Sequence, residues 1–189
     1  RLSSRLVASP ATRTALGEVL ARRVPLVHPG GAWAGAVPGK DPVDVTVDAV
    51  VSLDRSYLCV QGPPGAGKTY TAAKCISALV AKRRRVGVMA VSHRAITHLM
   101  LKALETVAED SSAGGAGASG CKALKLGGPS GDLRELEAAC SRDPQLAARV
   151  LRGASAIGEE GLPDDELIVG GTAWAFASDA LQAQLDVLF

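Results

Sequence analysis

The pattern of apolar and polar positions along the chain predicts strands and helices that follow one another in turn. Five apolar runs have the length of a buried strand, and they occupy residues 57–60, 86–91, 123–126, 167–169 and 185–189. Between them, apolar residues at helical spacing predict helices from 68 to about 82, at 94–107, at 132–151 with an interruption near Asp143-Pro144, and at 179–184. Strands that alternate with helices pair in parallel through right-handed crossovers, so the pattern indicates an α/β fold.

The first quarter of the chain contains two signals for a helix start, each a capping residue followed by proline. Ser9-Pro10 predicts a helix to about residue 22 with the apolar face Ala15, Leu16, Val19 and Leu20. Asp41-Pro42 predicts a short helix to about 53 with the apolar face Val43, Val47, Val50 and Val51. Residues 24–42 hold four prolines and several glycines, as a linker does. We therefore expect 1–40 to form a helical extension with a linker and 41–189 to form the main domain.

A low-complexity stretch follows the helix predicted at 94–107. Residues 108–120 end in a run of Gly, Ala and Ser. Such a composition lacks the side chains that pack a core, so we expect a mobile surface loop.

The strand predicted at 57–60 runs directly into a glycine-rich segment that opens a helix. Gly62, Gly67, Lys68 and Thr69 satisfy the pattern G-x-x-x-x-G-K-[ST]. Glycines let the backbone turn its amides inward around an anion, and the N-terminus of the next helix adds a partial positive charge. A chance match on a glycine and proline turn is the alternative, but the strand before the segment and the helix after it favour a phosphate-binding P-loop.

The ligand expected at this loop is ATP with Mg²⁺. Lys68 is expected to reach the β- and γ-phosphates, and the Thr69 hydroxyl to coordinate the metal ion, so these two residues receive the catalytic roles. The full nucleotide-binding set comprises Gly62, Pro63, Pro64, Gly65, Ala66, Gly67, Lys68, Thr69 and Tyr70.

The segment from Gln61 to Thr69 resembles motif I of superfamily 1 helicases. The closest resemblance is to the branch of nonsense-decay RNA helicases and related DNA-replication helicases, and within it to bacterial helicases fused to a RecB-type nuclease. Judged from the order of motifs, the resemblance covers roughly residues 43–189. It implies the first RecA-like domain of an ATP-dependent helicase or translocase, an incomplete P-loop NTPase sheet with helices on both faces, and single-stranded nucleic acid as the partner.

Residues 90–96, after the second predicted strand, resemble motif Ia of the same family. The resemblance implies contacts to a nucleic-acid backbone from Ser92, His93 and Arg94, although the family more often has Asn where His93 stands. A hydroxyl and a cation at a helix N-terminus are good phosphate ligands in any case. The alternative for Ser92 is that it is simply an N-cap.

Residues 170–174, after the strand predicted at 167–169, resemble motif Ic. The resemblance assigns a backbone contact to Thr172. Trp174 can stack on a base, which is worth about 1–3 kcal/mol, and a buried core tryptophan is the equally open alternative. In parallel sheets, ligands gather beyond the carboxyl ends of the strands, where all three motif segments are expected to lie.

The acids that orient water for hydrolysis are not recognisable in the sequence. In the family, a Walker B Asp-Glu pair directly follows a strand like the one at 185–189, where this chain stops, and Asp164-Asp165-Glu166 follows no strand. The chain also begins without methionine. We expect a fragment of a longer motor that lacks the second RecA-like domain and binds nucleotide without hydrolysing it alone. The resemblance implies movement from 5′ to 3′, on DNA rather than RNA.

The composition bears on the partner, the compartment and the chance of a membrane span, but it does not decide the function. The net charge is +2, and the dense basic run 82–85 is expected to be a solvated turn, with a nucleic-acid patch as the alternative. No stretch reaches the roughly 18 apolar residues of a membrane span. The four cysteines form no C-x-x-C pair, which suits a reducing cytoplasm, and Cys59 and Cys75 are expected to be buried as small hydrophobes.

Two other hypotheses for the function of the chain stay open: a small-molecule phosphotransferase, and a non-catalytic or degenerate nucleotide-binding module.

Overall fold

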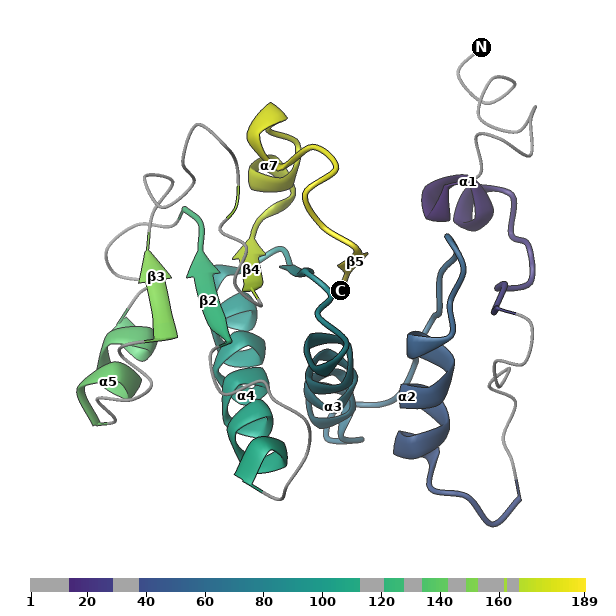
Figure 1. Ribbon diagram of the computed structural model, residues 1–189, viewed down its shortest axis with the longest axis horizontal. Coiled ribbons are helices and arrows are strands. Elements are labelled where there is room, and N and C mark those ends of the chain that lie inside the picture. The colour runs from purple at the N-terminus through teal and green to yellow at the C-terminus, as the bar shows by residue number, and fades with distance from the viewer. Residues whose placement is uncertain are drawn as a thin grey trace. The chain divides into compact units, whose positions relative to one another are not determined.

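The computed structural model describes residues 14–28, 38–112, 121–127, 134–142, 149–152, 162 and 167–189. The chain divides into two compact units, Arg1–Thr71 and Ala72–Phe189. The division falls inside helix α3 (Lys68–Ala81), and each unit has its own secondary structure (Figure 1).

Helix α1 (Ala15–Leu20) is shorter than predicted because it begins at a capping residue inside the expected helix. Thr14 has extended backbone angles, and its Oγ1 accepts a hydrogen bond from the Gly17 amide at 3.1 Å. A helix running unbroken from residue 10 is therefore wrong, and the predicted cap at Ser9-Pro10 lies outside the described residues.

The predicted apolar face of α1 is not buried. Leu16 and Leu20 are 60% and 63% exposed, whereas Glu18 is buried. Arg23 Nη1 donates a hydrogen bond to Glu18 Oε1 at 3.1 Å, and this ion pair offsets part of the cost of burying the carboxylate. Helical spacing shows which residues share a face, but not which face of so short a helix turns inward.

Helix α2 (Pro42–Val51) begins where the sequence predicted. Asp41 caps it by accepting a hydrogen bond from the Val43 amide at 2.8 Å, with Pro42 at the first helical position. Its buried residues are Val45, Ala49 and Val50, so of the predicted face only Val50 is buried.

Part of the expected linker is paired with the end of α2. Val27 forms an antiparallel bridge with Leu53. Next to it, the His28 amide donates to the Ser52 carbonyl at 2.8 Å. These residues are therefore held by the first unit, while 29–37 lie outside the described residues.

The strand predicted at 57–60 does not form. Residues 56–63 have no regular secondary structure, and Cys59 and Val60 are exposed. An apolar run becomes a strand only when a neighbouring backbone supplies its ladder hydrogen bonds, and no strand in the described part of the chain pairs with 57–60. The prediction that Cys59 is a buried hydrophobe is wrong for the same reason.

The second unit is a parallel sheet with connecting helices. Its elements after α3 are β1 (Val86–Met89), α4 (His93–Ser112), β2 (Lys122–Lys125), α5 (Arg134–Arg142), β3 (Val150–Arg152), β4 (Leu167–Gly171), α7 (Ala173–Phe176), the 3₁₀ turn η4 (Asp179–Leu181) and β5 (Val187–Leu188). The five strands lie in the order β3-β2-β4-β1-β5, and every pair is parallel. The α/β class is confirmed, as are the strands predicted at 86–91, 123–126, 167–169 and 185–189.

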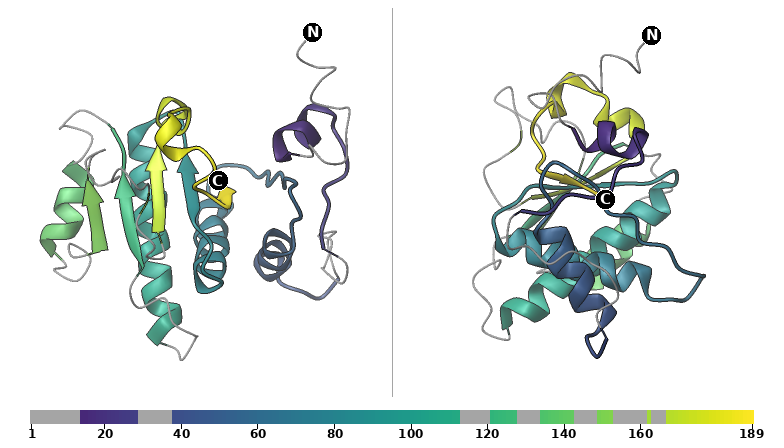
Figure 2. Two further views of the ribbon diagram at one scale, coloured as in Figure 1. Left: turned by 45° about the horizontal axis from the view of Figure 1, so that its top comes forward. Right: turned by 90° about the vertical axis from the view of Figure 1, so that its right-hand side faces the viewer.

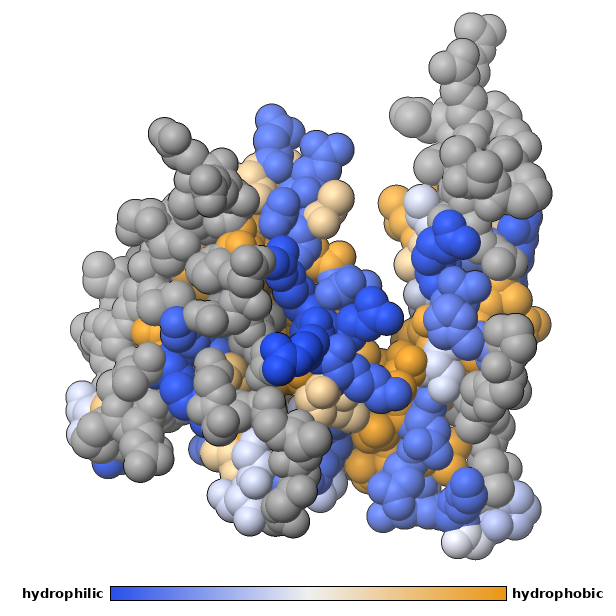
Figure 3. Space-filling view, viewed as in Figure 1, coloured by the Kyte–Doolittle hydropathy of each residue, from blue (hydrophilic) through white to orange (hydrophobic). Residues whose placement is uncertain are grey.

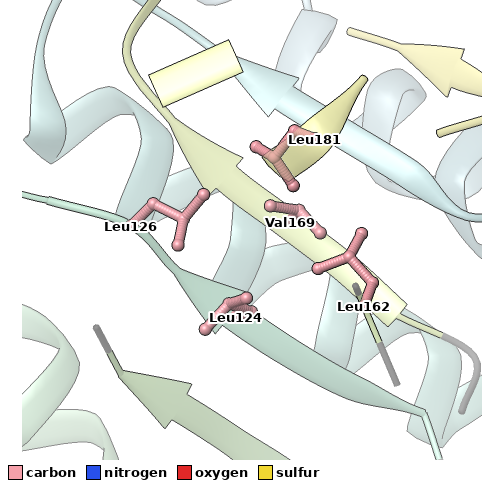
Figure 4. Packing of buried hydrophobic residues seen from close by; sticks show 5 residues of the cluster. All are labelled: Leu124, Leu126, Leu162, Val169 and Leu181. Atoms are coloured by element: carbon pink, nitrogen blue, oxygen red, sulfur yellow. The ribbon is translucent and has the colours of Figure 1, made fainter. Parts of the chain in front are cut away.

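The sheet is covered on two faces. Helix α4 lies on one face, and α7 lies on the other (Figure 2). Gly170 in β4 allows α4 to approach closely, because a Cβ atom there would overlap Met100 Sδ and stand 2.7 Å from Ile96 Cγ2. On the opposite face, a buried cluster joins Leu124, Leu126, Leu162, Val169 and Leu181 (Figure 4).

Several boundaries in the second unit differ from the prediction. Helix α4 continues to Ser112, so 108–112 of the expected loop are helical, and 113–120 lie outside the described residues. Val150–Arg152 is a strand rather than the end of a helix, because its backbone pairs with β2. Helix α7 was not predicted, and the helix expected at 179–184 is reduced to the single turn η4.

An ion pair fixes the end of α4 to α3. Asp110 accepts hydrogen bonds of 2.7 Å from Lys74 Nζ and from Ser77 Oγ. Partial burial raises the pKa of Asp110, but these hydrogen bonds and the charge of Lys74 outweigh it, so the pKa lies below its ordinary value. The folded state therefore favours the ionised form. The stabilisation is present above the ordinary aspartate pKa of about 4 and is lost as the pH falls through the lowered pKa.

Replacing Asp110 with asparagine is expected to lower the free energy of unfolding at neutral pH by about 0.5–1 kcal/mol, because both partners of the pair are partly exposed. The difference from the unmodified chain should shrink as the pH falls below about 4 and through the lowered pKa of Asp110, where the folded chain also binds the proton. Urea unfolding at neutral and acid pH measures both effects. Glu109→Gln, an exposed neighbour, is the control and should change stability by less than about 0.5 kcal/mol. A penalty for Asp110→Asn that is the same in acid would contradict the assignment.

The basic run 82–85 forms the turn after α3, as predicted. Arg83 has a φ of 58°, and the amides of Arg83 and Arg84 close the helix by bonding back to carbonyls of its last turn. Asp186, just before β5, accepts a hydrogen bond from the Arg85 amide at 2.8 Å and lies 3.4 Å from Arg84 Nη1. Hydrophilic side chains gather around the C-terminus, which is marked in Figure 1 and seen from the same side in Figure 3.

Candidate functional site

The glycine-rich segment of the first unit forms a tight turn. The Pro63 carbonyl accepts a hydrogen bond from the Ala66 amide at 3.2 Å, and Gly65 between them has a φ of 80°. This is the geometry of a type II turn with Pro64 at its second position, and its third position favours glycine. The sequence therefore bends the backbone sharply just before α3 begins.

Gly67 determines where the first amides of α3 lie. Its φ is 79°, and its carbonyl accepts a hydrogen bond from the Thr71 amide at 2.9 Å. The amides of Lys68, Thr69 and Tyr70 precede that bond and have no carbonyl partner within the helix. Within the described residues these three amides donate to no other acceptor. Together with the helix dipole, they form a binding position for an anion.

Lys68 folds back over the turn. Its Nζ donates hydrogen bonds of 2.7 Å to the carbonyls of Gly62 and Pro63, and its side chain is exposed. The ammonium is thus held against the loop rather than extended into solvent. Phosphate oxygens are stronger acceptors than carbonyls for an ammonium, so a phosphate chain on the loop can replace these partners.

The loop residues fit a nucleoside triphosphate with Mg²⁺. Backbone amides and Lys68 supply positive charge, and Thr69 places a hydroxyl in the first turn of α3. Tyr70 is 47% exposed in the same turn. The predicted set from Gly62 to Tyr70 therefore forms one continuous loop and helix start. This composition is typical of loops that bind phosphates, whereas hydrolysis needs an acid that none of these residues provides.

A second group of predicted residues lies in the second unit, at the carboxyl ends of neighbouring strands. Met89 at the end of β1 pairs with Gly171 in β4, and Lys125 at the end of β2 pairs with Gly170. The segments that follow these three strands therefore begin side by side. Residues 90–94, 125–127 and 172–174 are called the carboxyl edge from here on. The predicted residues Ser92, His93, Arg94, Thr172 and Trp174 all lie in segments that follow paired strands at this edge.

Ser92 is an N-cap, as the alternative interpretation held. Its Oγ accepts a hydrogen bond from the Ala95 amide at 3.2 Å. The cap uses the oxygen as an acceptor and leaves the hydroxyl proton for another partner, so capping is compatible with donation to a phosphate. Arg94 is exposed in the same helical turn.

His93 is only partly exposed and contacts a residue that the sequence pattern did not indicate. Its Nδ1 lies 2.8 Å from Nζ of Lys125, whose side chain is 1% exposed. The signal that could have revealed Lys125 is a lysine inside the otherwise apolar run 123–126. Because the neighbouring residues of that run are buried, a charged side chain there needs polar partners.

Trp174 is 88% exposed in α7, so the buried-core alternative for this residue is wrong. Thr172 occupies the N-cap position of α7, and its side chain makes no capping hydrogen bond. The sequence pattern placed Val91 in the buried strand predicted at 86–91, but it lies beyond the end of β1 and is fully exposed at the same edge. Covering an exposed indole with another apolar surface lowers the free energy of the system. The exposed Trp174 side chain therefore suits stacking on a base.

No protein-family model, curated protein or solved structure matches this chain. Among the described residues, no helix is long and apolar enough to cross a membrane. The same residues contain no group of three or more His, Cys, Asp or Glu side chains that could hold a metal ion.

Proposed function

We propose that this chain is the nucleotide-binding part of an ATP-driven nucleic-acid motor of the superfamily 1 helicase type, with a RecA-like fold. The observation that carries the proposal is the loop from Gly62 to Thr69. It combines two left-handed glycines, helix amides without intrahelical partners, and Lys68 held against the turn. The parallel sheet of the second unit supports the RecA-like part of the proposal.

The loop residues would bind the phosphates of Mg-ATP in three ways. The first amides of α3 donate hydrogen bonds, Lys68 exchanges its two carbonyl partners for phosphate oxygens, and Thr69 offers its hydroxyl to Mg²⁺. When bound, ATP supplies the phosphoanhydride bond whose cleavage drives such motors.

Displacement of a fluorescent ATP analogue from the intact chain tests the nucleotide site. In the presence of Mg²⁺, ATP and ADP should displace the analogue. AMP should do so far more weakly, because it lacks the β- and γ-phosphates that the loop is expected to hold. Equal displacement by AMP, or no binding of the analogue, would remove the basis of the proposal.

Single-stranded nucleic acid is the proposed partner of the carboxyl edge. The exposed Trp174 offers a stacking surface, and Ser92 and Arg94 offer phosphate ligands at the end of an adjacent strand. This combination favours a motor over a small-molecule phosphotransferase, because transfer to a small molecule does not require an exposed stacking surface at this edge. DNA is proposed ahead of RNA, and movement from 5′ to 3′, by analogy with nuclease-linked helicases only.

Replacing Trp174 with alanine is expected to weaken binding of a single-stranded oligonucleotide by about fivefold to 150-fold, which corresponds to about 1–3 kcal/mol of lost stacking. Trp174→Phe keeps an aromatic face and should retain most of the affinity. Fluorescence anisotropy with labelled DNA and RNA measures both variants. Stacking carries no charge, so the salt dependence of the binding constant should not change. Unaltered affinity in Trp174→Ala would show that the indole does not contact the strand.

A further inference from the structure

Lys125 is a buried lysine at the carboxyl edge that the proposed nucleotide and nucleic-acid contacts do not use. It ends β2, its side chain is 1% exposed, and it lies beside the first residue of α4. A lysine at such depth cannot touch a ligand in solvent directly. It can act only through the groups that it contacts.

Three polar groups of the described residues lie within hydrogen-bond distance of the Lys125 ammonium. His93 Nδ1 lies 2.8 Å from Nζ, the Leu126 carbonyl 3.0 Å and the Gly127 carbonyl 3.2 Å. Two of these acceptors belong to the turn after β2. The third is the side chain at the start of α4, so Lys125 ties His93 to the end of a neighbouring strand.

The contact with Lys125 couples the tautomer of His93 to the protonation of the lysine, because the role of each ring nitrogen depends on the tautomer. An ammonium can only donate, so Nδ1 has to accept, and a neutral imidazole that accepts at Nδ1 carries its proton at Nε2. A Lys125 ammonium in this contact would therefore favour one tautomer of His93.

We propose that Lys125 is a positioning residue, which holds His93 so that its Nε2–H donates a hydrogen bond to a backbone phosphate of single-stranded nucleic acid. The inference rests on the proposed function, because it needs a strand at the carboxyl edge. Exposed Ser92 and Arg94 flank His93 in the sequence, so the same phosphate chain would meet a hydroxyl, an imidazole and a guanidinium in succession.

The tautomer of His93 can be measured in the unmodified chain. Long-range proton–nitrogen NMR spectra should show His93 Nδ1 without a proton and Nε2 with one. In Lys125→Met, which removes the donor and keeps an unbranched side chain, the two nitrogens should move toward averaged shifts. A proton on Nδ1 in the unmodified chain would overturn the proposal, and this result needs no variant to fold.

Oligonucleotide binding tests the consequence of the contact. Lys125→Met and His93→Ala should each weaken binding about tenfold, the loss expected for one hydrogen bond to a charged group. The double variant should also be about tenfold weaker rather than 100-fold, because both changes remove the same interaction. Lys125→Arg, which keeps a donor, should recover part of the affinity.

Two controls separate positioning from direct contact and from misfolding. Lys122→Met removes the same charge at the start of β2 and should change affinity less than about twofold. The salt dependence should be unchanged in Lys125→Met, whereas loss of a direct phosphate contact would lower its slope by about 0.7. Mg-ATP should bind Lys125→Met and the unmodified chain equally.

The results that would contradict the role of Lys125 differ from those that would contradict the proposed function. Unchanged oligonucleotide affinity in Lys125→Met, or losses that multiply in the double variant, would overturn this inference alone. An unmodified chain that binds Mg-ATP but no oligonucleotide would overturn the inference together with the nucleic-acid part of the proposed function. A chain that binds the oligonucleotide but no Mg-ATP would overturn only the nucleotide site.

Discussion

Replacing Lys68 with alanine is expected to weaken the binding of Mg-ATP by about 100-fold, or about 3 kcal/mol. Lys68 is the cationic side chain held against the loop, through the carbonyls of Gly62 and Pro63. Without it, the backbone amides remain, but the β- and γ-phosphates lose their charged partner. Titration calorimetry measures the effect.

Lys82→Ala is the matched control for this prediction. Lys82 is exposed at the opposite end of α3, about 20 Å away by the rise of an α-helix. Its removal changes the net charge by the same amount without touching the loop. Affinity in Lys82→Ala should remain within about twofold of the unmodified chain. If both variants lost affinity equally, general electrostatics rather than the P-loop lysine would be responsible.

Replacing Gly170 with valine is expected to lower the free energy of unfolding by about 3 kcal/mol. Even the first carbon of the new side chain would overlap Met100 Sδ and press on Ile96 Cγ2. Both neighbours are fully buried, so α4 has to move away from β4 or the side chains have to leave their preferred rotamers. Urea unfolding followed by circular dichroism measures the loss.

The Met100→Ala background shows whether overpacking causes this loss. Shortening Met100 opens space over Gly170, so Gly170→Ala should cost less free energy in that background than in the unmodified chain. Of the three atoms nearest to the first carbon added at Gly170, only Ile96 Cγ2 would remain. Equal costs in both backgrounds would mean that the penalty arises from the backbone of β4 instead.

The strands of the sheet could be predicted from the sequence where each apolar run was long enough to be buried on both faces. The runs at 86–91 and 167–169 became the central strands β1 and β4 for this reason. The edge strand β3 could not be predicted, because Val150 and Leu151 continue the helical spacing of 132–151 and only pairing with β2 makes them a strand. The run at 57–60 shows the opposite case, an apolar sequence without a pairing partner in the described residues.

The glycine-rich loop could be predicted because its residues are consecutive in the sequence. Gly65 and Gly67 take positive φ values, and the lysine and threonine follow at a fixed spacing. The carboxyl edge could be predicted only in part, because it joins segments distant in the chain. Lys125 reaches His93 through the pairing of β2 with β4, a register that no local pattern contains. The exposure of Trp174 likewise depends on how α7 leaves the sheet.

The exposed position of Cys59 has a practical consequence for studying this protein. Its thiol is accessible just ahead of Gly62, whereas Cys75, Cys121 and Cys140 are buried. Burial also raises the pKa of Cys75 to about 11, which keeps that thiol unreactive near neutral pH. A maleimide dye would therefore couple selectively beside the glycine-rich turn. The natural chain thus accepts a fluorescent reporter there without any cysteine having to be introduced or removed.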